Sequence, residues 1–315
     1  MGDNMFFEYT SDSHLRLLLR LDRGNAVRKA IGRVIEKGDR VLDAGTGTGL
    51  LSFMALQCGA ESITAIDNAN LPMAKNLAKE NGWSEKINFI NADLFDENIP
   101  GVEGKYDVVL GFMYMNNIVL DEERARVVRR LANQHGKNGV KVIPNGIRYS
   151  AQLVEFPEND VFTYRSDLDA ARKLLESNYD MKFESLIQRV KSEIGIYQAC
   201  PVYGGHYSWQ PSQASASARF ERGHFRSLSV IKEVFTHNLQ DVESDFVEIP
   251  KEVTLDISQS GKADGVIWQQ ELIFDDIIIW TTETFSPFLN NKNVVAGGLL
   301  NLELDEEWKV SNFLK

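Results

Sequence analysis

The stretch Val41-Leu42-Asp43-Ala44-Gly45-Thr46-Gly47-Thr48-Gly49-Leu50-Leu51-Ser52 decides the fold of this chain. A short apolar run ends in an acid, breaks into three glycines at alternate positions, and resumes as an apolar helical pattern. This order is typical of the first strand, tight turn and first helix of a doubly wound α/β domain, in which ligands bind at the carboxyl ends of the strands. Glycine at such a turn lets the backbone approach a ligand that a Cβ would push away.

A second strand is predicted at residues 62–67, and it ends in Asp67, eighteen residues after the last of those glycines. A carboxylate at the tip of the second strand is placed to accept both hydrogen bonds of a ribose diol. Asn68 stands directly beside it. Asp67 and Asn68 are therefore candidate cofactor-binding residues.

The spacing of the glycines separates two classes of cofactor. A dinucleotide fingerprint reads G-x-G-x-x-G and holds a pyrophosphate at the helix N-terminus. Here the third glycine falls one residue early, and Asp43 precedes the first glycine by two residues. A carboxylate there would repel a pyrophosphate but suits the ammonium and sulfonium of S-adenosylmethionine (SAM). The pattern predicts SAM and the class I methyltransferase fold, with Asp43, Gly45, Gly47 and Gly49 in the site; a tight turn without a ligand is the plainer alternative.

Composition limits the other classes of function. The chain has 315 residues, of which 43% are hydrophobic and 25% charged, as in ordinary globular proteins. Its net charge of −11 argues against a general affinity for nucleic acid. No apolar run approaches the ~20 residues that span a bilayer, and the two cysteines, Cys58 and Cys200, have no metal-binding spacing. We expect a cytoplasmic protein with no bound metal and no membrane partner.

The order of predicted elements indicates two kinds of domain. Up to Pro144, strands alternate with helices, including a strand at 106–111, a helix that Asp121 opens and that runs to about Gln134, and a strand at 140–144. After Pro144, strands dominate: 148–155, 227–235, 253–257, 266–274 and 277–282. We expect an N-terminal helical segment (1–36), a Rossmann-like α/β domain (37–145), and a β-barrel-like domain (146–315) with an inserted helical arm near 160–190.

One further acid follows the third predicted strand, at 86–91. Asp93 and its neighbour Leu94 stand where a carboxylate can accept a hydrogen bond from an adenine amino group. An acid in an ordinary loop is nearly as good a reading of Asp93 by itself.

The order of these features resembles the protein arginine methyltransferase family. Residues 41–60 are similar to its motif I and following helix, 131–144 to its segment before the barrel, and 178–183 to its N-Y-G-F-D-F stretch. The resemblance implies that Arg23 binds the cofactor's carboxylate, that Asp67 is the ribose acid, and that Asp93 lies by the adenine. It also implies a homodimer joined through the arm, although an arm folded over its own barrel is an alternative.

The chain departs from that family where the acceptor binds. The family's S-E-W-M-G-Y loop has a second glutamate further on, and two carboxylates hold a guanidinium whose pKa lies above about 12. Here Phe112 replaces the first glutamate and Asp121 falls at the second. The family's T-H-W loop has no clear counterpart. Arginine in a protein is therefore a doubtful acceptor.

The candidate catalytic residues are Tyr114, Asn116 and Asp121, although Tyr114 and Asn116 could equally line the cofactor pocket. His206 could serve on the substrate side, but a surface-loop histidine is the plainer interpretation. Three functions stay open: N- or O-methylation of a small metabolite or peptide natural product (a non-histone acceptor), arginine methylation with a divergent carboxylate set, and a non-catalytic SAM-binding scaffold. The sequence does not name the acceptor atom.

Overall fold

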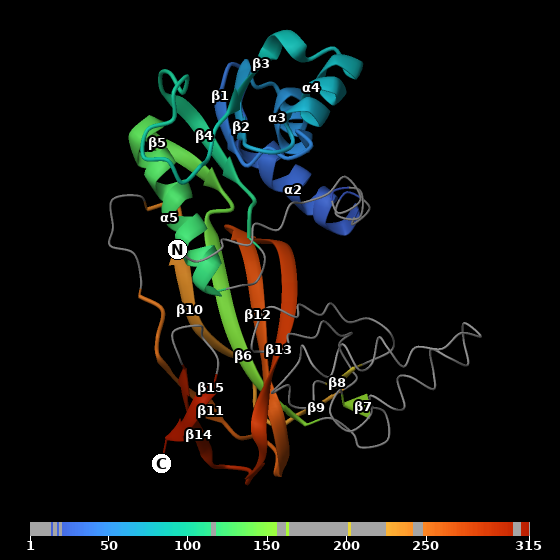
Figure 1. Ribbon diagram of the computed structural model, residues 1–315, viewed down its shortest axis with the longest axis vertical. Helices are drawn as coiled ribbons and strands as arrows, with labels where there is room; N and C mark the ends of the chain where they lie inside the picture. Colours follow the sequence, from blue (N-terminus) through green and yellow to red (C-terminus); the bar gives the residue numbers. More distant parts are fainter. Residues whose placement is uncertain are drawn as a thin grey trace, which may run out of the picture. The chain divides into compact units, whose positions relative to one another are not determined.

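The computed structural model describes residues 14, 18, 21–114, 118–155, 162–163, 201–202, 225–241, 248–304 and 310–314 (Figure 1). These residues belong to two compact units. The first holds the described residues within 1–148, 236–247 and 271–281, and the second holds those within 149–235, 248–270 and 282–315.

A parallel sheet of five strands forms the centre of the first unit, in the order β3-β2-β1-β4-β5. Its strands are β1 (Arg40–Ala44), β2 (Ser62–Asp67), β3 (Ile87–Asn91), β4 (Tyr106–Gly111) and β5 (Gly136–Ile143). The chain runs outward from β1 to β3 and then returns to β4 on the other side of β1. The edge between β1 and β4 is therefore the point where the strand order reverses, which is where ligands bind in doubly wound sheets.

Helices cover both faces of this sheet. They are α2 (Leu21–Val34), α3 (Leu50–Cys58), α4 (Leu71–Glu80) and α5 (Ile118–His135), with a 3-10 turn η1 (Ser84–Lys86) before β3. Right-handed crossovers put α3 and α4 on one face and α5, which joins β4 to β5, on the other. Helix α2 packs on α3, and Figure 1 draws α5 across the sheet from these helices.

Close packing between α5 and β4 requires a glycine at the end of β4. An added methyl at Gly111 would come within 2.5 Å of Val128 Cγ2, and Val128 is fully buried. Helix α5 can therefore lie directly against β4, which leads into the predicted acceptor loop (residues 112–117). The start of α5 and the end of β4 are held at one edge of the sheet.

Strands make up the rest of the described chain. One sheet has the order β10-β6-β12-β13 with β9 paired to β6, a second has the order β11-β14-β15, and β7 pairs with β8. Their bounds are β6 (Gly146–Glu155), β7 (Phe162–Thr163), β8 (Pro201–Val202), β9 (Arg226–Ser227), β10 (Lys232–Asn238), β11 (Glu252–Asp256), β12 (Gly261–Phe274), β13 (Ile277–Val294), β14 (Leu299–Leu304) and β15 (Val310–Leu314). The pairs β6–β9, β11–β14 and β14–β15 are antiparallel.

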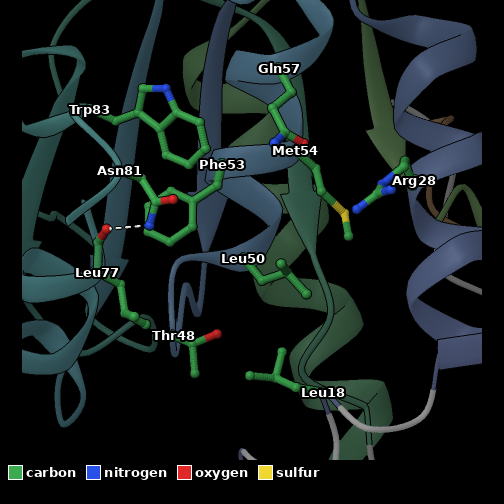
Figure 2. A pocket seen from close by; sticks show the side chains of 10 residues that line it. All are labelled: Leu18, Arg28, Thr48, Leu50, Phe53, Met54, Gln57, Leu77, Asn81 and Trp83. Atoms are coloured by element: carbon green, nitrogen blue, oxygen red, sulfur yellow. Dashed lines mark hydrogen bonds between the residues drawn. The ribbon is translucent and has the colours of Figure 1, made fainter. Parts of the chain in front are cut away.

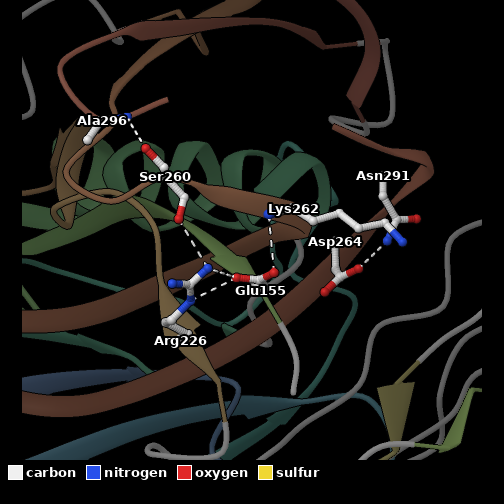
Figure 3. Close-up of polar contacts among 7 residues, drawn as sticks. All are labelled: Glu155, Arg226, Ser260, Lys262, Asp264, Asn291 and Ala296. Carbon is white, nitrogen blue, oxygen red and sulfur yellow. Dashed lines mark hydrogen bonds and ion pairs between the residues drawn. The ribbon is translucent and has the colours of Figure 1, made fainter. Parts of the chain in front are cut away.

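Glu155 joins three strand ends in the second unit (Figure 3). Its Oε2 accepts a hydrogen bond from Arg226 Nε at 2.8 Å, and its Oε1 accepts one from the Lys262 backbone N–H at 3.2 Å. Arg226 also donates to the Ser260 carbonyl at 3.1 Å. An exposed ion pair alone adds at most about 1 kcal/mol to stability. We therefore interpret the main effect of this cluster as fixing how β6, β9 and β12 are aligned with one another.

The α/β elements predicted from the sequence are confirmed, and two details of the prediction are wrong. Helix α5 begins at Ile118, so Asp121 lies inside its first turn and does not open it. The single strand predicted at 227–235 is two strands, β9 and β10. The chain changes partners between them, because Leu228 donates to the Leu153 carbonyl while Ser229 bridges to Ile257.

Several predictions remain untested. The arm near 160–190 lies outside the described residues except for Phe162–Thr163. The domain boundaries 1–36, 37–145 and 146–315 stay predictions. No helix among the described residues is long and apolar enough to cross a membrane.

Candidate functional site

The glycine turn after β1 adopts a backbone that only glycine takes without strain. Gly45, Gly47 and Gly49 have φ angles of 78°, 54° and 84°, in the left-handed region that a Cβ disfavours. The backbone N–H groups of Gly45 and Thr46 donate to the Ile66 carbonyl at 2.9 and 3.0 Å. The turn is thereby tied to the end of β2, next to the second predicted acid.

Asp43 is the most enclosed acid of the turn. Its side chain is fully buried, and its Oδ2 accepts hydrogen bonds from the Thr46 and Ser52 hydroxyls at 2.8 and 2.6 Å. Its Oδ1 is buried with no hydrogen-bond partner in the described part of the chain. Burial raises the pKa of Asp43 to about 6. An orphaned carboxylate oxygen of this kind invites a cationic donor, so the turn fits the ammonium of SAM.

Asp67 is bound by backbone groups on both of its oxygens. Oδ2 accepts from the Gly47 N–H at 2.8 Å, and Oδ1 accepts from Ala69 and Asn70 at 2.9 and 2.8 Å. A carboxylate has about four acceptor sites, so one remains for a ligand hydroxyl. The acid is therefore both a support for the glycine turn and a candidate ribose acceptor. Asn68 is exposed beside it.

His14 lies against the glycine turn, which sequence reasoning did not predict. A methyl added at Gly47 would come within 2.9 Å of His14 Cε1. Burial lowers the pKa of His14, against the opposing influence of Asp67 and Asn70. No spacing signal in the sequence could have revealed this contact, because it joins the N-terminal segment to a turn more than thirty residues on.

The loop after β3, here called the adenine loop (residues 92–96), borders the glycine turn at Gly45. Asp93 Oδ1 accepts from the Phe95 backbone N–H at 2.9 Å. Leu94 is buried, and its Cδ1 lies 3.7 Å from the position that a Cβ on Gly45 would take, with Met113 Cβ at 3.8 Å on the other side. The space beside Gly45 is thus bordered by the predicted adenine loop and by the predicted acceptor loop.

Arg23 and Phe112 meet at the carboxyl end of β4. Ala44 of β1 is in register with Gly111 of β4, so Phe112 follows the sheet edge next to the glycine turn. The guanidinium carbon of Arg23 lies 5.7 Å from the centroid of the Phe112 ring. The structure therefore brings together the predicted carboxylate-binding arginine and the residue that replaces the first glutamate.

Tyr114 lies in the acceptor loop after β4, and Asp121 lies in the first turn of α5. The Tyr114 hydroxyl is buried with no hydrogen-bond partner among the described residues. Burial, and then the nearby Asp121 carboxylate, raise the pKa of Tyr114 well above its usual value. Asp121 is fully buried and forms an ion pair with Arg124 at 3.2 Å. Asn116 lies outside the described residues.

A cavity of about 270 Å³ lies between α2, α3 and α4 (Figure 2). Its walls are mostly apolar and include the rings of Phe53 and Trp83, whose centroids are 5.1 Å apart. Thr48 of the turn borders it, but Asp43, Asp67 and Asp93 are not among its lining residues. The described residues contain no group of three or more His, Cys, Asp or Glu arranged to hold a metal ion.

The parallel sheet, the glycine turn and the acid after β2 define a class I SAM-dependent methyltransferase fold, and a family model agrees with this class. Residues 27–149 match the model described as ribosomal protein L11 methyltransferase (PrmA). The match covers the α/β unit from within α2 to the start of β6.

Two relatives each match a little over a third of this chain. A ribosomal protein L11 methyltransferase from Exiguobacterium sp. is 34% identical over 121 residues, which are 38% of this chain and 35% of that protein. The ribosomal protein arginine N-methyltransferase rmt3 of Schizosaccharomyces pombe is 33% identical over 114 residues, which are 35% of this chain and 21% of that protein. The chain thus spans about a third of the first relative and a fifth of the second.

Solved structures match nearly the whole chain at low identity. Arabidopsis thaliana protein arginine methyltransferase 10 has a TM-score of 0.65 and 18% identity, over 94% of this chain and 87% of that one. A chain of the Trypanosoma brucei PRMT1 enzyme-prozyme heterotetrameric complex with AdoHcy has a TM-score of 0.62 and 16% identity, over 94% and 89%. The chain therefore has the arginine methyltransferase fold, a Rossmann-like α/β sheet followed by a β-rich region.

Proposed function

We propose that this protein is a SAM-dependent methyltransferase whose acceptor group is neutral or anionic. The cofactor, when bound, supplies a methyl group on a sulfonium. Asp43, with its unpartnered Oδ1, would hold the ammonium, and Asp67 would accept from the ribose. Asp93 and Leu94 would border the adenine, and Arg23 would bind the carboxylate.

The contact between Arg23 and Phe112 carries the proposal for the acceptor. A guanidinium acceptor needs carboxylates that fix its charge and aim one nitrogen at the methyl group. At this edge it would instead meet an aromatic ring already covered by the Arg23 guanidinium. A ring offers a cation only about 0.5–2 kcal/mol and does not aim one of its nitrogens, as a carboxylate pair would.

Asp121, the carboxylate at the family's second glutamate position, is already neutralised in part. Asp121 pairs with Arg124, so it cannot give a substrate guanidinium its full charge. The Tyr114 hydroxyl, which is protonated at neutral pH, would donate a hydrogen bond to an oxygen or nitrogen of the acceptor. Such a group orients the acceptor, and orientation supplies much of the rate of an in-line methyl transfer.

The acceptor class that fits these groups is a small metabolite or a peptide natural product, methylated on nitrogen or oxygen. Asp121 would take a proton from an acceptor that must lose one, and Asn116 would help to orient it. A carboxylate acceptor would need no general base.

Two alternatives have specific support. The relatives named as ribosomal protein methyltransferases favour a ribosomal protein acceptor, including its arginine side chains. The structural likeness to a chain of an enzyme-prozyme complex favours a scaffold that binds SAM without catalysis. Phe112 stands where the arginine methyltransferase family has its first glutamate, which weighs against the arginine reaction. The Tyr114 hydroxyl is buried with no hydrogen-bond partner among the described residues, which weighs against a scaffold without catalysis.

Cofactor binding and turnover test the proposed function in two steps. Calorimetry should show SAM and S-adenosylhomocysteine (SAH) binding with micromolar affinity, and no comparable binding of NAD. Incubation with SAM and a pool of metabolites, peptides and ribosomal proteins should then produce SAH and one methylated product. SAM binding without turnover on any acceptor would favour the scaffold, and preferential NAD binding would contradict the proposal.

A further inference from the structure

Arg130 of α5 binds the loop that follows β3. Its Nη2 donates hydrogen bonds to the carbonyls of Leu94 and Asp96 at 2.5 and 2.8 Å, and its Nη1 donates to the Phe95 carbonyl at 3.4 Å. Three successive carbonyl groups are thus held by one half-buried guanidinium. Bonds from a charged donor are about twice as strong as neutral ones.

The loop held by Arg130 is the loop that borders the cofactor site. Inside it, Asp93 caps the turn by accepting from Phe95, and Asp96 donates to the Asp93 carbonyl at 3.2 Å. These short-range bonds shape the turn, and the Ala92 N–H ties its start to β2 by donating to the Asp67 carbonyl at 3.4 Å. The bonds to Arg130 tie residues 94–96 to α5, which packs on β4 at Gly111. The Leu94 side chain is thereby held against the space beside Gly45.

The same helix carries the acceptor loop's carboxylate. Asp121 lies nine residues before Arg130 on α5, which is about 14 Å along the axis at ~1.5 Å per residue. Arg130 therefore connects the loop after β3 to the helix whose first turn holds Asp121.

We infer that Arg130 is a positioning residue, which sets the adenine loop for the cofactor and links that loop through α5 to the acceptor site. The inference rests on the proposed function, because it assumes an adenine-containing ligand beside Asp93. Arg130 does not touch the reacting atoms. It acts through the carbonyls of residues 94–96, which place Asp93 and Leu94.

Adenine selectivity tests this role more sharply than affinity does. The ligands are SAH and S-inosylhomocysteine, in which an oxo group replaces the adenine amino group. Asp93 accepts from the amino group and repels the oxo group, so wild type should prefer SAH by about tenfold or more. Arg130→Met keeps an unbranched apolar stem and removes the guanidinium with its donors. We expect it to bind SAH about tenfold more weakly and to lose most of that preference.

Two further variants separate positioning from general damage. Arg126 lies one turn before Arg130 on α5, is exposed, and pairs with Glu122. The control variant Arg126→Met should bind both ligands as wild type does. Arg130→Lys retains a charged donor and should recover part of the preference. Hydrogen exchange should also show that SAH slows amide exchange at residues 118–122 in wild type and not in Arg130→Met.

The outcomes distinguish this inference from the proposed function. Equal SAH affinity and equal preference in wild type and Arg130→Met would overturn the role of Arg130 and leave the proposed function standing. An equal loss for both ligands would show that Arg130 is merely structural. Failure of wild type to bind SAH would overturn the proposed function and, with it, the inference.

Discussion

The guanidinium carbon of Arg23 lies 5.7 Å from the centroid of the Phe112 ring. This contact joins helix α2 to the end of β4, and it places an aromatic ring where an arginine-modifying enzyme would need a carboxylate. We attribute the proposed acceptor preference to that missing carboxylate.

Replacement of Phe112 by glutamate tests the charge of the acceptor site. The new carboxylate would pair with Arg23 and draw it from the cofactor's carboxylate, so Phe112→Glu should bind SAH about tenfold more weakly, a loss of ~1.4 kcal/mol. Natural turnover should fall at least as much. Phe112→Leu removes the ring without adding charge and should lose less. Calorimetry measures the first effect; improved turnover by Phe112→Glu would contradict this interpretation of the site.

The buried acid of the turn should make the free protein less stable as pH rises. The pKa of Asp43 is about 6 in the fold, against 3.8 for an ordinary aspartate. The folded state therefore binds more protons between these values and loses stability as pH rises through them. The shift corresponds to about 3 kcal/mol at most. Asp43→Asn should therefore unfold at higher urea concentration than wild type at pH 7.5, with a smaller or no advantage at pH 4. A variant less stable than wild type at pH 7.5 would argue against a strained acid.

Binding of SAM should lower the raised pKa of Asp43. A bound ammonium favours the ionised form of Asp43, so wild type should release protons on binding SAM at pH 5.5, as measured by calorimetry in buffers of different ionisation enthalpy. His14 also titrates at the turn. The difference between wild type and Asp43→Asn isolates the acid, and equal proton release by the two proteins would remove Asp43 from the site.

Asp67 should matter for both the turn and the ligand. In Asp67→Asn the new amide N–H₂ would face either the Gly47 N–H or the Ala69 and Asn70 N–H groups, which costs about 1–3 kcal/mol for an unsatisfied donor. SAH affinity should fall by more than tenfold, because the ribose loses a charged acceptor. Glu61→Gln, at the other end of β2, removes an exposed acid and should change neither property. Unchanged calorimetric affinity would exclude Asp67 as the ribose acid.

Glycine variants test the packing of α5. Gly111→Ala places a methyl 2.5 Å from Val128 Cγ2, and overpacking of this kind costs about 1–3 kcal/mol. Gly24→Ala lies inside α2 with nothing within 4 Å of the added methyl, so it should stabilise the protein by about 0.5–1 kcal/mol. Urea unfolding of the two variants should move in opposite directions. Equal midpoints would mean that α5 does not rest closely on β4.

Association is expected through the segment near 160–190. Because that segment resembles an inserted dimerisation arm, we predict a homodimer, which sedimentation at micromolar concentration should detect. Deletion of residues 164–190 should give a monomer that keeps the α/β unit folded. A wild-type monomer at that concentration would favour an arm folded over its own barrel.

The local parts of the fold were predictable from the sequence because each depends on neighbouring residues. The alternating glycines at 45, 47 and 49 indicated a turn, and the turn has the positive φ angles that they imply. The apolar run before Asp67 indicated β2. Periodicity and turn chemistry determine such elements within a few residues.

The parts that the sequence did not reveal depend on contacts between distant segments. His14 packs on Gly47, and Arg130 binds the carbonyls after Asp93. Neither residue has a local pattern that separates it from an ordinary surface side chain. The predicted strand at 227–235 was wrong for the same reason, because the break at Ser229 comes from pairing with Ile257.

Transfer of a labelled methyl group from SAM tests the central claim most directly. Purified protein would be incubated with methyl-labelled SAM and, in parallel, with arginine peptides, ribosomal proteins and a fractionated metabolite and peptide extract, and mass spectrometry would locate the label. We predict label on a neutral or anionic acceptor in the metabolite or peptide fraction, with none on guanidinium nitrogens. Efficient labelling of arginine side chains by the wild-type protein would contradict the account.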